Sequence, residues 1–117
     1  KLINNQEVIN FLENKRFKSY QVSKLDFFEQ IYLFNNADVI ISPHGAALTN
    51  IIFSEPDLKL FELIPNNHDS VKCERISEFL NFQYTRIALD PIIPYQKGDI
   101  KIEIDELKKI LKSINLS

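Results

Sequence analysis

Apolar residues recur at helical spacing in two stretches of the first third of the chain. Asn4 and Glu7 open the first stretch with the pattern of a capping box, and Asp26 and Glu29 open the second in the same way. We therefore expect two helices. Between them, residues 17–22 are aromatic and β-branched enough to predict a strand. The residues expected to face inward are Val8, Phe11 and Leu12 in the first helix and Phe27, Phe28, Ile31 and Phe34 in the second.

Two apolar runs, over residues 39–41 and 58–64, predict buried strands, and residues 82–89 are predicted to form a third strand. Helical patterns over 46–53 and from residue 69 or 70 onward separate these runs. Strands that alternate with helices across short connections imply parallel pairing and right-handed crossovers. The predicted fold class is therefore α/β, a Rossmann-like parallel sheet with flanking helices. The residues expected to be buried in the two helices are Leu48, Ile51 and Ile52, then Cys73, Ile76, Phe79 and Leu80.

The last part of the chain alternates isoleucines and then returns to helical spacing. Ile100, Ile102 and Ile104 predict a short final strand, and Asp105 is expected to cap a helix with lysines on its outer face. The expected inner face consists of Leu107, Ile110, Leu111 and Ile114. The opening helix is unusual, because in such folds the first helix normally packs on a strand that precedes it. We therefore expect residues 1–117 to be a single domain and a fragment of a longer protein.

Composition excludes several classes of function. The formal net charge of −2 over 117 residues gives no basic field for a phosphate backbone, so no nucleic-acid partner is expected. No apolar stretch approaches the roughly 20 residues of a bilayer-spanning helix, so no transmembrane segment is expected. The single cysteine, Cys73, excludes an intrachain disulfide, and two histidines are too few for a four-ligand zinc site built from Cys and His. These features predict a soluble protein of a reducing compartment.

The Ser-Pro-His-Gly turn at residues 42–45 carries the strongest chemical signal. It lies between a predicted strand and a predicted helix, where open α/β sheets bind ligands and a helix start offers free N–H groups to an anion. Gly45 is expected to need a positive φ or to let a phosphate come close, and His44 is expected to donate to a ligand oxygen. Thr49 and Asn50 follow one turn later and are expected to reach the same ligand. A tight structural turn with a satisfied histidine explains the pattern equally well.

Glu62 is the second signal, because it interrupts an apolar strand and is costly to bury without a partner. One interpretation is a carboxylate that accepts hydrogen bonds from two ribose hydroxyls. The other is an ion pair with a local Lys or Arg residue, for example Lys59 or Arg86. Two further candidates favour structural interpretations: Cys73 as a small buried hydrophobe, and His68 as a surface loop residue with at most a minor ligand role.

The chain from Asn4 to Tyr84 resembles glycosyltransferase family 61. The residues that carry the resemblance are Phe28-Glu29-Gln30, the run from Ala37 to Phe53 with its His-Gly-Ala-x-Leu-Thr-Asn core, the run from Phe61 to Pro65, and Tyr84. The resemblance implies the C-terminal, donor-binding half of a two-domain GT-B enzyme. Such an enzyme transfers a sugar with inversion from a nucleotide sugar, expected to be UDP-linked, to a glycan or polysaccharide acceptor.

The resemblance also implies roles for individual residues. His44 would be catalytic, and the substrate-binding residues would be Ser42, Gly45, Ala46, Thr49, Asn50 and Glu62. It implies no metal, which agrees with the absence of an Asp-x-Asp motif, and no cofactor. The general base and the acceptor domain would lie outside this chain, so the isolated chain is expected to be inactive. A cytoplasmic, bacterial protein of capsule or other polysaccharide biosynthesis is expected. The alternative is a non-catalytic nucleotide-binding or structural α/β module.

Overall fold

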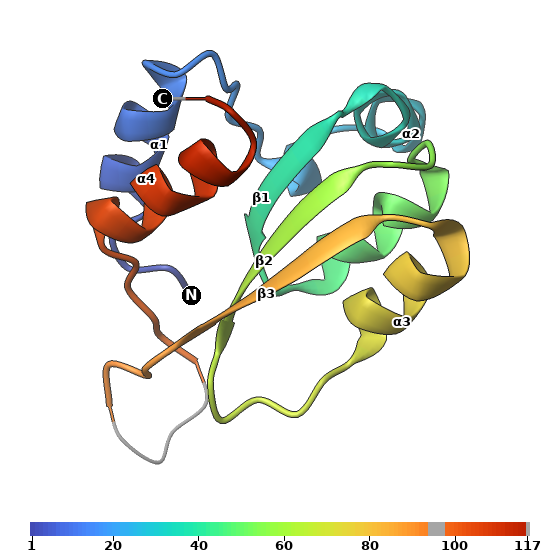
Figure 1. The fold of residues 1–117 in the computed structure, drawn as a ribbon. Helices are drawn as coiled ribbons and strands as arrows, with labels where there is room; N and C mark the ends of the chain where they lie inside the picture. The colour runs from blue at the N-terminus through green and yellow to red at the C-terminus, as the bar shows by residue number, and fades with distance from the viewer. Residues whose placement is uncertain (94–97, 117) are drawn as a thin grey trace.

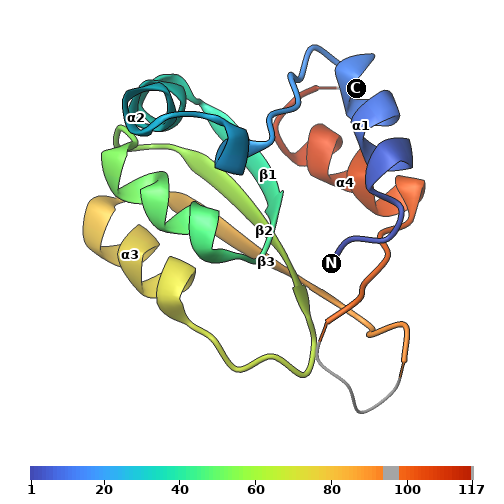
Figure 2. The same ribbon diagram turned by 180° about the vertical axis from the view of Figure 1, so that it is seen from behind.

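The computed structural model describes residues 1–93 and 98–116. Its single sheet consists of three parallel strands in the order β1-β2-β3, namely β1 (Val39–Pro43), β2 (Lys59–Pro65) and β3 (Gln83–Leu89). Helices α1 (Asn5–Glu13) and α4 (Ile104–Ser113) lie on one side of the sheet (Figure 1). The other side is covered by α2 (Phe27–Asn36), the 3₁₀ helix η2 (Ala46–Phe53) and α3 (Lys72–Leu80) (Figure 2). The predicted α/β, Rossmann-like fold class is confirmed.

The central strand β2 separates two apolar cores. Phe61 and Leu63 pack toward α1 and α4, whereas Leu58 and Leu60 pack toward α2, η2 and α3. Successive side chains of a strand point to opposite faces, so Glu62 lies on the same face as Leu60. That face is the one covered by η2 and α3.

The predicted strand over residues 17–22 does not form. Residues 17–21 have no regular secondary structure, and Val22 begins a short 3₁₀ helix, η1 (Val22–Lys24). The segment has a strand-like composition, but a strand exists only where a neighbour pairs with its backbone groups. No strand among the described residues pairs with this segment.

The end of the chain also differs from the prediction. Ile100 makes only isolated bridges, one to Leu2 and one to Pro91, and no final strand forms among the described residues. Helix α4 starts at Ile104, so Asp105 lies inside its first turn instead of capping it. A carboxylate in the first turn still stabilises the helix through its dipole.

One of the two predicted capping boxes is present. The carboxylate of Asp26 accepts from the backbone N–H of Glu29 at 2.8 Å, and the carboxylate of Glu29 accepts from the N–H of Asp26 at 3.0 Å. Asn4 precedes α1 as predicted, but its side chain makes no cap. It donates instead to the side chain of Glu7 at 2.8 Å and to the carbonyl of Ile102 at 2.7 Å. The contact with Ile102, which ties α1 to the segment before α4, replaces the local cap.

Most residues predicted to face inward are at least half-buried, but four are exposed: Phe27, Phe28, Ile52 and Phe79. In α3 the buried positions are Cys73 and Ser77, which places Phe79 on the outer side. The four residues were predicted to be buried only because they are apolar and fit helical spacing. One boundary also shifts, since α3 begins at residue 72, and the helix over residues 46–53 has the predicted bounds but is a 3₁₀ helix. No helix of residues 1–93 and 98–116 is long and apolar enough to span a membrane.

Candidate functional site

The carboxyl ends of β1 and β2 bring His44 and Glu62 together. His44 follows β1 directly, and its backbone N–H donates to the carbonyl of Leu63 at 2.8 Å, which continues the ladder by one residue. The Nδ1 atom of His44 lies 2.6 Å from the carboxylate of Glu62. The His44 side chain is 21% exposed and that of Glu62 is 2% exposed. His44 therefore connects a buried carboxylate to the surface.

Glu62 receives further hydrogen bonds from its own face of the sheet. The Tyr84 hydroxyl donates to the Glu62 carboxylate at 2.6 Å, and the Cys73 thiol also bonds to it. Burial raises the pKa of Glu62, but the hydrogen bonds from Tyr84, His44 and Cys73 lower it by more, so the net pKa lies below its ordinary value. A buried carboxylate with several donors is ionised at neutral pH.

Neither Lys59 nor Arg86 is the partner of Glu62, so the predicted ion pair with one of them is wrong. Arg86 lies opposite Glu62 in the strand register, but its guanidinium donates to two loop carbonyls. Tyr84, two positions earlier on β3, contacts the carboxylate instead. Whether Glu62 binds a ribose stays a prediction.

The ionised carboxylate fixes the proton position on His44. An ionised Glu62 can only accept, so Nδ1 of His44 carries the proton. The second ring nitrogen, Nε2, then has a lone pair in the neutral ring and an N–H in the protonated ring. His44 can thus accept a proton from a ligand or donate one to it, while Glu62 holds the ring in place.

His68 lies next to His44, although the sequence favoured a surface loop position for it. The two imidazole centroids are 4.5 Å apart with an angle of 55° between the planes. Arg86 holds the loop through its guanidinium, which donates to the carbonyl of His68 at 2.6 Å and to that of Ser70 at 2.9 Å. The signal that could have revealed His68 is its position, because it follows the carboxyl end of β2 as His44 follows that of β1.

Three other predicted site residues make contacts within the protein. The Asn50 amide donates to Gln30 of α2 at 2.9 Å, and the Ser42 hydroxyl donates to the carbonyl of Pro43 at 2.9 Å. The Thr49 hydroxyl accepts from the Lys72 ammonium at 3.0 Å. Asn50 is therefore bonded to α2 instead of to the His44 network. Lys72 is a basic neighbour of η2 that the sequence analysis did not single out.

The two glycines differ in their backbone requirement. Gly45 has φ of 175°, which is extended backbone that any residue adopts, so the expectation of a positive φ there is wrong. A Cβ at Gly45 would meet no heavy atom within 4 Å, and its close approach to a ligand stays a prediction. Gly98, by contrast, has φ of 141°, a backbone conformation that favours glycine. Ala46, the first residue of η2, is exposed.

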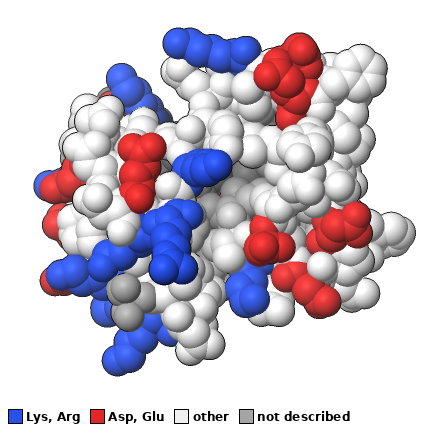
Figure 3. All heavy atoms as spheres, turned by 90° about the horizontal axis from the view of Figure 1, so that it is seen from above, with Lys and Arg blue, Asp and Glu red and all other residues white. Residues whose placement is uncertain are grey.

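The described residues also form a groove at the opposite end of the sheet. The surface seen from above is hollowed, with Lys and Arg side chains gathered mainly along one side (Figure 3). A groove of about 910 Å³ lies between residues 15–18 and α2, and none of the predicted site residues lines it. Among residues 1–93 and 98–116, no group of three or more His, Cys, Asp or Glu side chains could hold a metal ion.

These features define an α/β domain of the Rossmann-like class with a polar site at the carboxyl ends of its strands. Comparison with known families adds a specific match, since the model of the family Glycosyltransferase 61 matches residues 1–61. This match covers just over half of the chain. The chain belongs to glycosyltransferase family 61.

Curated relatives agree with this family. The chain is 32% identical over 84 residues to a β-1,2-xylosyltransferase from Oryza sativa subsp. japonica, covering 72% of this chain and 15% of that protein. It is 30% identical over 105 residues to an EGF domain-specific O-linked N-acetylglucosamine transferase from Xenopus laevis, covering 84% of this chain and 20% of that protein. These relatives come from a plant and a vertebrate and do not support the expected bacterial origin. No solved structure matches the chain significantly.

Proposed function

We propose that this chain is the donor-binding domain of a glycosyltransferase that uses a nucleotide sugar, UDP-linked in our proposal. Membership of family 61 supports sugar transfer, and the bond between His44 and Glu62 at the strand ends is the observation that carries the site. The chain spans 15% to 20% of the length of the two relatives described above. We therefore place it as the C-terminal Rossmann-like half of a two-domain GT-B enzyme, with a glycan or polysaccharide acceptor bound elsewhere.

His44 has the central role in the proposed reaction. An acceptor hydroxyl attacks the anomeric carbon, the bond from that carbon to the diphosphate oxygen breaks, and the configuration inverts. Negative charge develops on the departing diphosphate. His44 donates from Nε2 to this charge, and the N–H groups at the start of η2, near Gly45 and Ala46, add to its stabilisation. The acceptor proton passes to a general base outside this chain.

Glu62 and Tyr84 act through His44 in this proposal. At 2% exposure, the Glu62 carboxylate has little surface for a ligand, and its oxygens already accept from His44 and Tyr84. A carboxylate in this position orients the imidazole and keeps a proton on Nδ1. Glu62 is thus a positioning residue, and ribose binding by Glu62 is the weaker interpretation.

The remaining predicted residues contribute donor contacts. Ser42 begins the turn and Thr49 lies on η2, and both hydroxyls retain lone pairs for a ligand donor. Asn50 would have to exchange its bond to Gln30 for a bond to the donor. Asn50 is therefore a weaker candidate for donor binding than Ser42 and Thr49.

Turnover of a His44→Ala variant of the full-length enzyme tests the proposal. Loss of one donor at a developing anion costs roughly 3 to 4 kcal/mol, so we expect kcat to fall by about 10²- to 10³-fold. His68→Ala is the matched control, because it removes the neighbouring imidazole and leaves the bond to Glu62 intact. We expect it to lose less than about tenfold. Near-wild-type turnover of His44→Ala contradicts the proposed role.

A structural module without chemistry is the second candidate. One observation favours it, since His44 and Tyr84 already provide the buried Glu62 carboxylate with hydrogen bonds in the absence of a ligand. The two candidates differ in nucleotide binding by the full-length protein. Binding of UDP that depends on the turn at residues 42–45 supports the donor site, and its absence supports the structural module.

A further inference from the structure

Strand β1 has one edge without a strand partner. In a parallel ladder, successive residues direct their backbone groups to alternate edges. The carbonyl of Asp38 and the N–H of His44 bond to β2, so Ile40 and Ser42 also face β2, and Val39 and Ile41 face outward. No described residue bonds to the outward backbone groups of Val39 or Ile41. These groups form an open sheet edge.

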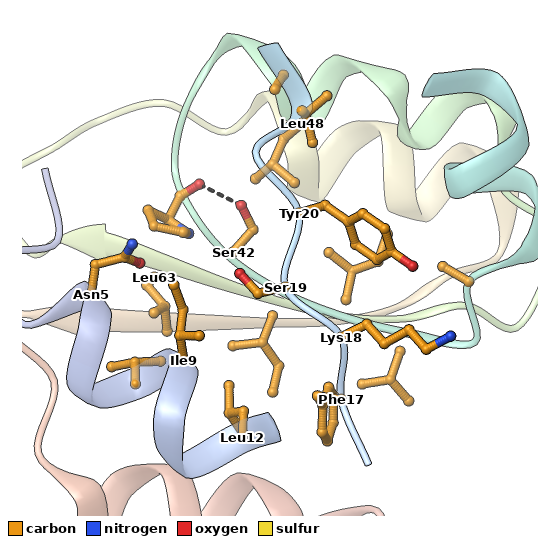
Figure 4. Close-up of a pocket in the computed structure, with 18 of the residues that line it drawn as sticks. Asn5, Ile9, Leu12, Phe17, Lys18, Ser19, Tyr20, Ser42, Leu48 and Leu63 are labelled. Atoms are coloured by element: carbon orange, nitrogen blue, oxygen red, sulfur yellow. Dashed lines mark hydrogen bonds between the residues drawn. The ribbon is translucent and has the colours of Figure 1, made fainter. Parts of the chain in front are cut away.

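An apolar slot runs along this open edge. It is a cavity of about 250 Å³ between β1, helix α1 and residues 17–20 (Figure 4). Protein interiors contain few voids larger than a water molecule, so a space of this size beside a strand is unusual. Ser42 and Pro43 line one end of the slot, next to the turn that holds His44. The apolar side chains that line it include Ile9, Leu12, Phe17, Tyr20, Ile41 and Leu63.

The wall of the slot opposite β1 also lacks backbone partners. Residues 18–20 have no regular structure, and no hydrogen bond joins their backbone to another described residue. The sequence of 17–22 nevertheless predicts a strand. Two backbone segments without partners therefore border one apolar space. An extended peptide satisfies both of them, whereas a small apolar molecule satisfies neither.

We propose that an extended apolar segment, N-terminal to Lys1 in a longer polypeptide, fills this slot as a parallel strand beside β1. Leu2 lines the slot, so a segment leaving it connects directly to α1. A longer polypeptide of this family has room for such a segment, since the chain spans only 15% to 20% of the length of the two relatives described above. A strand followed by α1 and a return to the sheet is the usual crossover of parallel folds. The segment makes β1 an internal strand.

Residue-level amide hydrogen exchange of the 117-residue chain and of the full-length protein tests this inference. We expect the protection of Val39 and Ile41 to rise at least about tenfold more than that of Ile40 and Ser42, which already bond toward β2. The alternation along β1 is an internal control, because a general stabilisation of the fold raises the protection of all four amides equally. An equal change at all four positions overturns the proposal. A reading frame with no residues upstream of Lys1 overturns it as well.

A pair of substitutions gives an independent test. Ile9 borders the slot, whereas Ile52 lies on η2 with half of its surface exposed. We expect Ile9→Ser to lower the urea midpoint of the full-length protein more than that of the 117-residue chain, and Ile52→Ser to affect both equally. Equal effects of Ile9→Ser overturn the proposal. Concentration-dependent protection of Val39 and Ile41 in the 117-residue chain would assign the slot to a second copy and also overturn it.

Discussion

Removal of the Tyr84 hydroxyl tests whether Glu62 is an ionised carboxylate held by hydrogen bonds. The hydroxyl donates to the carboxylate at 2.6 Å, and Glu62 is 2% exposed, so water cannot easily replace the lost donor. Tyr84→Phe keeps the ring and deletes only this donor. Tyr32, which is 72% exposed on α2, offers a matched control, Tyr32→Phe.

The expected loss follows from the type of bond. A hydrogen bond to a charged group contributes about 1.5 to 3 kcal/mol, so we expect Tyr84→Phe to cost about 2 kcal/mol. Unfolding entropy of about 2.1 cal/mol/K per residue gives roughly 0.25 kcal/mol/K for a domain of this length. The melting temperature of the 117-residue chain should therefore fall by about 8 °C, against less than about 2 °C for Tyr32→Phe.

The pH dependence identifies the charge on Glu62. The pKa of Glu62 in the folded protein lies below its ordinary value of 4.5, so its stabilisation is complete above that value and is lost as pH falls through the lowered pKa. The difference between Tyr84→Phe and wild type should accordingly be largest at neutral pH and shrink in acid. Thermal unfolding followed by circular dichroism measures both. A loss below about 2 °C at pH 7, or a loss independent of pH, refutes an ionised, bonded Glu62.

Three further predictions concern the fold. Asp26→Ala removes the observed capping box and should lower the free energy of unfolding by about 1 kcal/mol in urea denaturation; no change would contradict the cap. The pKa of the Cys73 thiol is raised to about 12 by burial and by Glu62, so we expect negligible reaction with a disulfide reagent at pH 8 until the chain unfolds, and fast labelling would refute this. Gly98→Ala should cost about 1 kcal/mol or more because φ is 141°, whereas Gly45→Ala should change stability by less than about 0.5 kcal/mol; equal costs would disprove the distinction.

The sheet could be predicted from sequence because its strands are distinct locally. The predicted strands are bounded by proline, asparagine and helical patterns, and those over 39–41, 58–64 and 82–89 correspond to β1, β2 and β3. The failures share one physical cause. The strand over 17–22 needs a neighbour, and the cap at Asn4 competes with Ile102, almost a hundred residues later. Local pattern carries no information on either partner.

The candidate site, like the fold, was predictable from sequence only where local pattern determines it. The strand-end positions of His44 and Glu62 follow from the order of elements, which sequence periodicity supplies. Their mutual bond depends on the register that pairs Ser42 with Glu62, and the choice of Tyr84 over Arg86 depends on how loop carbonyls bind the guanidinium. Both features depend on the tertiary structure. From the sequence, the partner of Glu62 was therefore predicted to be either a ribose or a basic residue, and neither option includes the observed His44 and Tyr84.

Calorimetric titration of UDP into the full-length protein and its Gly45→Val variant tests the central claim most directly. A Cβ at Gly45 meets no heavy atom within 4 Å, so Gly45→Val should leave the fold intact, and any loss of affinity then reports contact with the ligand. The donor-site proposal predicts that wild type binds UDP and that Gly45→Val, with an unchanged circular dichroism spectrum, binds at least about tenfold more weakly. Equal affinity of the two proteins, or no binding of UDP or any nucleotide sugar by wild type, would contradict it.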